Sequence, residues 1–269
     1  MISQNIQRKL IFISYFIIMS IALLVPVSLP IAVTKPVQDL YDTIESIPNG
    51  SVVFIDSEVG TLTIPEVYPQ LISFIKQSIK KNFKFVIGSF IGVECAIITR
   101  QALNDLSGEL SGYKYGVDYV ALGYFPGGQA SIAAFGKDIH SLVKTDIDGT
   151  PIENLPLMKD LHEAKDFALF MLATSEPLYF IRQIYAPYGG ILVSGCDSVG
   201  FAASYAYYSS GQLKGLLNGS RGAAEYERLL GYAGKATSLL NIQSFSHLFI
   251  LGLLITGNIV FWSGKVKKK

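Results

Sequence analysis

Hydrophobic and polar residues divide this chain into two apolar ends and a mixed middle. Leu10 to Thr34 contains no charged residue, and Phe245 to Trp262 is a second apolar segment without Asp, Glu, Lys or Arg. A helix of roughly 20 apolar residues crosses the hydrocarbon core of a bilayer. The pattern predicts a transmembrane helix over 1–35, an extramembrane domain over 36–240, and a second transmembrane helix with a basic tail over 241–269.

Each apolar segment has an alternative interpretation. The first could be a cleaved signal peptide, but its apolar run exceeds the usual ~7–15 residues and shows no clean small-x-small cleavage site. The second could be the buried core helix of a soluble domain. We expect both segments to be retained as membrane helices.

The middle of the chain alternates short apolar runs with segments of helical periodicity. The apolar runs predict strands at Ser51–Asp56, Lys84–Ser89, Tyr119–Tyr124, Phe167–Ala173 and Ile191–Cys196. The helical segments between and around them are Pro36–Ile47, Pro65–Lys81, Gly92–Leu106 and Pro177–Tyr185. Such alternation is typical of a parallel sheet covered on both faces. We therefore expect a three-layer α/β domain, Rossmann- or flavodoxin-like, with about five mainly parallel strands.

Charge is distributed unevenly along the chain. All 21 acidic residues lie between Asp39 and Glu227. The basic residues that flank the two apolar segments are Arg8, Lys9, Lys35, Lys265 and Lys267–Lys269. By the positive-inside rule, Arg8-Lys9 and the terminal lysines predict cytoplasmic termini and an external domain. The domain between Pro36 and Leu240 has 15 basic and 21 acidic residues, and its negative charge argues against nucleic acid as a partner.

Polar residues and glycines follow the predicted strands, where an open parallel sheet binds its ligands. They are Asp56-Ser57-Glu58, Gly88-Ser89, Gly127-Gly128, Thr174-Ser175-Glu176 and Asp197-Ser198. Because the carboxyl ends of parallel strands share one edge, these residues predict a rim that could hold a small polar ligand. The alternative is that Gly, Ser and Asp serve only as turn and helix-cap residues.

The sequence lacks the usual motifs of nucleotide-binding and metal-binding sites. Neither GxGxxG nor GxxxxGK[ST] occurs, so no nucleotide cofactor is expected. The three histidines lack metal-ligand spacing, and Asp146 with Asp148 is more typical of a solvated turn than of a calcium loop. Cys95 and Cys196 lie in apolar contexts and are expected to be buried free thiols.

One local pattern suggests an enzyme. Gly200-Phe-Ala-Ala-Ser204 resembles the nucleophile segment of Clp and signal-peptide-peptidase serine proteases, and Pro126-Gly127-Gly128 resembles their oxyanion-hole loop. The resemblance implies Ser204 as nucleophile, Gly127 and Gly128 as oxyanion donors, and Lys214 as the nearest lysine base in the sequence. An extra strand and helix separate the two motifs, and no histidine lies between Ser204 and the second apolar segment. Small residues on a close-packed helix explain the same pattern.

A glycine-rich polar segment from Gly211 to Glu227 precedes the second apolar segment. Its glycines at 211, 215, 219 and 222 are three or four residues apart, as on one strip of a helix. Close helix approach along that strip, with polar contacts from Gln212, Lys214, Arg221 and Glu225, predicts an interaction surface for a second copy or another membrane protein. The alternative is a solvated face with salt bridges.

The run SGQLKGLLNGSRGAAEYERLLG in this segment resembles a group of prokaryotic membrane proteins that have a helix at each end and an α/β domain between. The resemblance implies this architecture but no particular activity. The leading hypothesis is a non-enzymatic, membrane-tethered domain that binds a ligand or assembles with partners. The rival hypothesis is a membrane-bound serine hydrolase that uses Ser204.

Overall fold

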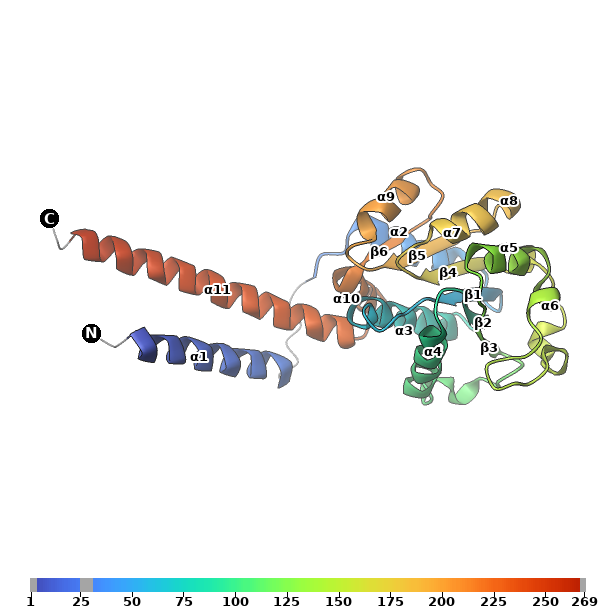
Figure 1. Cartoon of the computed structure of the whole chain (residues 1–269), viewed down its shortest axis with the longest axis horizontal. Helices are drawn as coiled ribbons and strands as arrows, with labels where there is room; N and C mark the ends of the chain where they lie inside the picture. The colour runs from blue at the N-terminus through green and yellow to red at the C-terminus, as the bar shows by residue number, and fades with distance from the viewer. Residues whose placement is uncertain (1–3, 25–30, 267–269) are drawn as a thin grey trace. The chain divides into compact units, whose positions relative to one another are not determined.

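The computed structural model describes residues 4–24 and 31–266, and it divides into two compact units. One unit comprises residues 31–236 and contains the α/β fold. The other comprises the terminal segments, 1–30 and 237–269. Figure 1 shows the helices and strands of both units.

The α/β unit is built on a six-stranded sheet in the order β3-β2-β1-β4-β5-β6, with every neighbouring pair parallel. The strands are β1 Val52–Ser57, β2 Lys84–Ser89, β3 Tyr119–Tyr124, β4 Leu169–Ala173, β5 Leu192–Cys196 and β6 Leu216–Asn218. This sheet confirms the predicted α/β class. Each of the five predicted strands is present, and its ends differ from the predicted ends by at most two residues. The sixth strand, β6, was not predicted.

Helices cover both faces of the sheet (Figure 1). They are α2 Lys35–Ser46, α3 Ile64–Lys80, α4 Val93–Asp105, α5 Gln129–Lys137, α6 Ile139–Leu142, α7 Leu178–Phe180, α8 Ala186–Tyr188, α9 Phe201–Ser209 and α10 Gly219–Leu230. A π-helical turn, Ile181–Tyr185, joins α7 to α8. Short 3₁₀ turns occupy Glu109–Gly112, Ile152–Asn154, Pro156–Met158 and Ala164–Asp166.

Strand β1 lies at the centre and contributes to two separate cores. Phe54 points to one face, where its ring centroid lies 4.8 Å from that of Phe135 and 5.7 Å from that of Phe170. Val53 and Ile55 point to the opposite face and pack in the core formed with α2, α3 and α10. All three residues are fully buried, as the alternation of side chains along a strand requires when both faces are covered.

The segment from Gly211 to Glu227 does not form the predicted continuous helical path. Gly211 lies in a turn, Gly215 precedes β6, and Gly219 is the first residue of α10. Gly211 and Gly219 have φ values of +79° and +49°, which an α-helix does not use. The helical spacing of the glycines was therefore misleading, because they serve a turn, a strand and a helix in succession.

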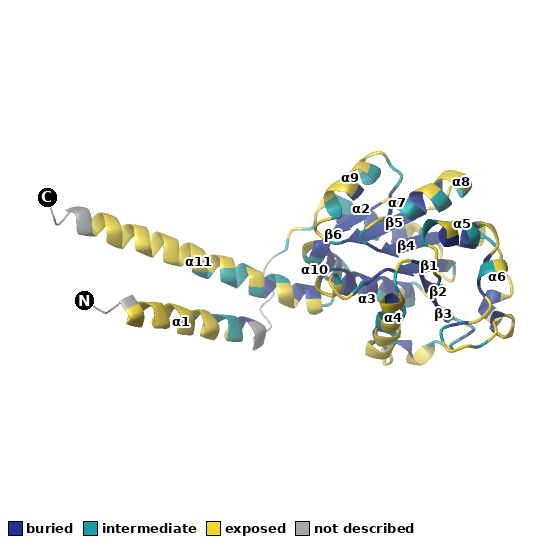
Figure 2. Ribbon diagram, viewed as in Figure 1, coloured by how far each residue is buried: buried dark blue, intermediate teal, exposed yellow. Residues whose placement is uncertain are grey.

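The terminal unit contains two long apolar helices, α1 Gln4–Leu24 and most of α11 Lys235–Val266. By length and composition, Asn5–Ala22 and Lys235–Ser263 are long and apolar enough to cross a membrane. Most of their described side chains are exposed (Figure 2). Within this unit Tyr15 Oη and Ser246 Oγ are 3.0 Å apart, so a hydrogen bond joins α1 to α11.

Candidate functional site

The strand order reverses between β1 and β4. The chain runs from β1 outward to β3 on one side, then returns to place β4 on the other side of β1. Open parallel sheets bind ligands at such a reversal, beyond the carboxyl ends of the strands. A cavity of about 380 Å³ lies there, and we call it the β1–β4 cleft. Its lining residues are Glu58, Gly60, Thr61, Leu62, Thr63, Ile91, Glu94, Cys95, Thr174, Ser175, Glu176 and Tyr179.

Glu58 forms a fixed part of the cleft wall. Its Oε2 accepts a hydrogen bond from Ser89 Oγ at 3.0 Å, and its Oε1 accepts from the backbone N–H of Phe90 and from that of Ile91 at 3.2 Å. These bonds join the end of β1 to the turn between β2 and α4. The side chain is nearly buried, with 6% of its surface exposed. Its carboxyl group is therefore held in place before any ligand arrives.

Asp56 lies behind Glu58 and is fully buried. No described N–H or O–H group donates a hydrogen bond to either carboxyl oxygen of Asp56. Burial, followed by the charge of Glu58, raises the pKa of Asp56 well above its ordinary value. Burial also raises the pKa of Glu58, although the surrounding N–H groups oppose the change.

Helix α4 closes the cleft on the side of β2. Cys95 is a free, buried thiol, as predicted. Burial and the nearby Glu58 raise its pKa to about 12, so it stays protonated and is a poor nucleophile. Behind it, Thr99 Oγ1 donates to Ser57 Oγ at 2.7 Å. Ser57 is fully buried and joins β1 to α4 rather than facing the cleft.

The opposite wall comes from the turn after β4, which is hydrogen-bonded to the turn after β5. Ser175 Oγ donates to Asp197 Oδ2 at 2.8 Å, and Asp197 Oδ1 accepts from Gly200 N–H at 2.7 Å. The N–H and hydroxyl groups of Ser198 donate to Glu66 Oε2 at 2.7 and 2.6 Å. The predicted residues Asp197 and Ser198 thus hold these turns together but do not line the cleft. Among the residues joined by these hydrogen bonds, only Ser175 lines it.

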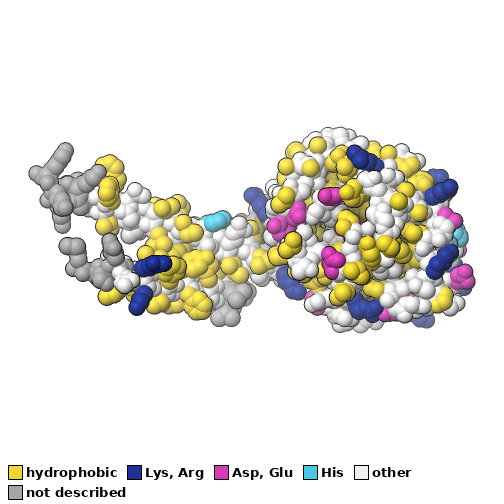
Figure 3. Space-filling view, in the orientation of Figure 1, with side chains coloured by type: hydrophobic (Ala, Val, Ile, Leu, Met, Phe, Trp, Pro, Cys, Tyr) yellow, Lys and Arg dark blue, Asp and Glu magenta, His cyan; other side chains and the backbone are white. Residues whose placement is uncertain are grey.

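The cleft is acidic. Among the described residues that line it, the only side chains charged at neutral pH are carboxylates, those of Glu58, Glu94 and Glu176. The neighbouring Glu176 raises the pKa of Tyr179. On the face shown in Figure 3, acidic side chains lie among hydrophobic ones, while Lys and Arg lie mainly toward the edges. This composition disfavours phosphate and suits a ligand with a positive charge or several donors.

The residues of the predicted protease site do not come together. Ser204 is the buried residue of α9. Lys214 is exposed. Gly127 and Gly128 follow edge strand β3, four strand positions from β5, which precedes α9. At ~4.8 Å per strand that separation is about 19 Å, too far for an oxyanion hole serving Ser204.

Ser204 is therefore expected to act as a packing residue. Ser204→Ala should change the free energy of unfolding by about 1 kcal/mol or less. Ser204→Leu should destabilise the fold by ~1–3 kcal/mol through overpacking. Urea denaturation measures both changes. Labelling of Ser204 in the native protein by a fluorophosphonate would contradict this role.

Arg221 and Glu225, two of the residues predicted to contact a partner, instead form a hydrogen bond with each other on α10. Arg221 Nε donates to Glu225 Oε1 at 3.0 Å, and Glu225 Oε2 accepts from Thr34 N–H at 2.8 Å and Thr34 Oγ1 at 2.7 Å. Glu225 is buried, so these bonds fix the entry into α2 against α10. Gln212 is half-buried and accepts a hydrogen bond from Ser210 Oγ.

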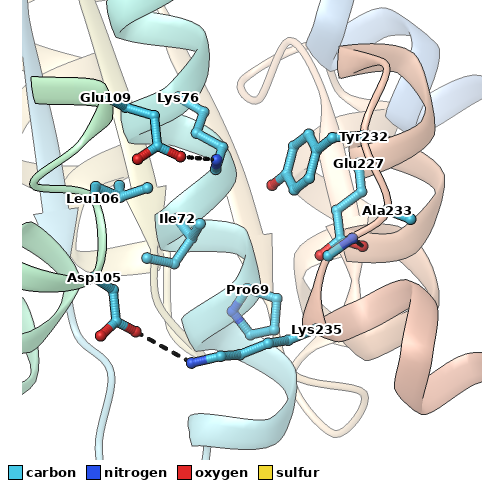
Figure 4. Close-up of a pocket in the computed structure, with 11 residues that line it drawn as sticks. Pro69, Ile72, Lys76, Asp105, Leu106, Glu109, Glu227, Tyr232, Ala233 and Lys235 are labelled. Carbon is cyan, nitrogen blue, oxygen red and sulfur yellow. Dashed lines mark hydrogen bonds and ion pairs between the residues drawn. The ribbon is translucent and has the colours of Figure 1, made fainter. Parts of the chain in front are cut away.

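A second hollow, of about 340 Å³, lies where α11 begins (Figure 4). Lys76 pairs with Glu109, and Lys235 pairs with Asp105 at 3.2 Å. Glu227 is buried and accepts from the N–H groups of Gly234 and Ala236 at 2.9 and 3.1 Å, so it caps the first turn of α11. These charges are satisfied within the protein, and the hollow is better explained as a structural junction than as a ligand site.

The Asp146 turn is structural. Asp146 Oδ1 accepts from the N–H groups of Asp148 and Thr150 at 2.9 and 2.7 Å, and Oδ2 accepts from Tyr115 Oη at 2.8 Å. Asp148 pairs with Arg100 at 2.6 Å. Across residues 4–24 and 31–266, no group of three His, Cys, Asp or Glu side chains is arranged to hold a metal ion.

The chain folds into an α/β domain whose parallel sheet has a cavity at its reversal of strand order. No protein-family model matches the chain, and neither a curated protein nor a solved structure matches it.

Proposed function

We propose that this chain is a membrane-tethered binding protein whose β1–β4 cleft takes a small polar ligand with a positively charged group. The observation that carries the proposal is the coincidence of the cavity with the strand-order reversal and with a lining whose only charged groups are carboxylates. α1 and α11 are the proposed membrane anchors, because both are long and apolar enough to span a bilayer.

The roles proposed for the cleft residues follow from their bonding. Glu58 is held by three N–H or O–H donors, so it orients the ligand without moving. Glu94 is exposed at the mouth and supplies charge that attracts a cation. The hydroxyls of Thr61, Thr63 and Ser175 offer further hydrogen bonds, which give such sites their specificity.

The test uses agmatine, which carries an ammonium and a guanidinium group, as the probe. We expect calorimetry on the full-length protein to detect binding, and Glu94→Gln to weaken it about tenfold through loss of one charged contact. Glu153→Gln removes an exposed carboxylate from a 3₁₀ turn that does not line the cleft, and it serves as the matched control. Equal binding by the two variants, or no binding by the native protein, would refute the proposal.

The proposed topology places both termini in the cytoplasm and the α/β unit on the other side of the membrane. The support is the cluster of basic residues outside the two apolar segments. In sealed right-side-out vesicles, we expect an external protease to digest the α/β unit and to leave a tag after Lys269 protected. Loss of the tag with an intact α/β unit would reverse the proposed orientation.

A further inference from the structure

Large aliphatic side chains are exposed in the lining of the β1–β4 cleft and on the first turns of α4, the helix that contributes Glu94 and Cys95 to that lining. Leu62 and Ile91 line the cleft and are 95% and 49% exposed. Val93 and Ile97 follow on α4 and are 65% and 68% exposed. Single exposed aliphatic residues are common on proteins, but a group of them beside a cavity marks a binding surface. We call these four side chains the apolar rim.

Folding of the domain does not require the apolar rim. Helix α4 packs on the sheet through Cys95, Thr99 and Ala102, which are its buried residues. Val93 and Ile97 are four residues apart, so they lie together on a different strip of the same helix. Glu94 lies between them in sequence and lines the cleft. An aliphatic strip beside an acidic cavity therefore faces outward from α4.

A free small cation would occupy the cavity but leave most of this rim in water. A lysine or arginine side chain of a polypeptide matches both features. Its aliphatic stem can lie against Leu62 and Ile91 while its charged head reaches Glu94 and Glu176, since long basic side chains bury their stems and keep their charges solvated or paired. Neighbouring apolar residues of the same polypeptide would then cover Val93 and Ile97.

We propose that the β1–β4 cleft and its apolar rim form a docking surface for a partner protein that inserts a basic side chain flanked by aliphatic residues. Charge complementarity identifies this occupant, because the lining carboxylates attract a cation and repel an anionic lipid surface. This inference rests on the proposed function and specifies the ligand as part of a polypeptide.

The experiment compares three probes on the full-length protein in phosphatidylcholine nanodiscs. They are agmatine, the acetylated pentapeptide amide Ala-Leu-Arg-Leu-Ala, and the same peptide with Gln in place of Arg. We expect the Arg peptide to bind about tenfold more tightly than agmatine, because it also buries aliphatic surface, and the Gln peptide to bind at least about tenfold more weakly than the Arg peptide.

Two substitutions separate the rim from the cavity. The double variant Val93→Ser/Ile97→Ser should lose the advantage of the Arg peptide while agmatine binding stays unchanged, because neither residue lines the cavity. Val199→Ser, at an aliphatic residue that is 90% exposed after β5, is the matched control and should bind the Arg peptide as the native protein does.

The outcomes distinguish this inference from the proposed function. If agmatine binds and the Arg peptide binds no more tightly, the polypeptide docking surface is refuted while the cation site stands. If the double variant keeps the full affinity for the Arg peptide, the apolar rim is not part of the surface. If neither probe binds, both proposals fail together.

Discussion

Gly215→Ala is expected to destabilise the α/β unit by about 3 kcal/mol or more, at the upper end of overpacking substitutions. An added Cβ would lie 2.2 Å from the Cα and 2.3 Å from the N of Leu40 in α2. These neighbours are backbone atoms, so no rotamer change relieves the clash. The substitution would separate α2 from β6, the strand that completes the sheet edge.

The two buried thiols provide the measurement. Cys95 and Cys196 both lie in the α/β unit, so their labelling by a thiol reagent in increasing urea reports the unfolding of that unit. The matched control is Gly108→Ala, where φ is −66° and an added Cβ meets nothing within 4 Å. It should stay within about 0.5 kcal/mol of the native protein. Similar stabilities for the two variants would show that Gly215 is not closely packed.

In the native protein the free energy of unfolding is expected to fall as pH rises. Asp56→Asn is expected to abolish most of that fall. The pKa of Asp56 is raised in the folded state, so the folded protein binds more protons than the unfolded protein above pH ~4. The contribution of Asp56 to stability is fully present below its unfolded pKa and is lost as pH rises through its folded pKa. We expect the stability of the native protein to fall as pH rises above ~4, and asparagine should largely abolish that fall.

Urea denaturation followed by near-ultraviolet circular dichroism, at several pH values, measures this difference. The exposed residue Asp160 supplies the control substitution, Asp160→Asn. Glu58 and Cys95 are the other titratable groups of the cluster, and both have raised pKa values. A native stability that rises with pH above ~4, with the same slope in Asp56→Asn, would contradict a raised pKa of Asp56 in the folded protein.

The strands were predictable because their buried apolar runs are continuous. Lys84–Ser89 and Tyr119–Tyr124 have the predicted limits. β6 was missed because it has three residues between Gly215 and Gly219, and its pairing with β5 depends on tertiary structure. The strand order is also a tertiary property, so the sequence could not identify β1 and β4 as the pair that borders the cleft.

Part of the cleft follows from the sequence. Glu58, Ser175 and Glu176 were expected at strand ends, and they line the cavity. Gly127 and Gly128 also follow a strand, but β3 lies at the sheet edge, away from the strand-order reversal. Glu94 and the apolar rim were missed because they lie within the first turns of a helix and in loops. Aliphatic residues placed outside the packing face of α4 are the signal that could have indicated them.

The most direct test of the cation-binding cleft is hydrogen exchange, read by mass spectrometry, on the full-length protein with and without saturating agmatine. We expect slower exchange in the segments 58–63, 91–95 and 174–179, which contribute the lining of the cleft. We expect no change around Tyr232 in the second hollow. Protection confined to that hollow, or unchanged exchange in all three cleft segments, would contradict cation binding in the cleft.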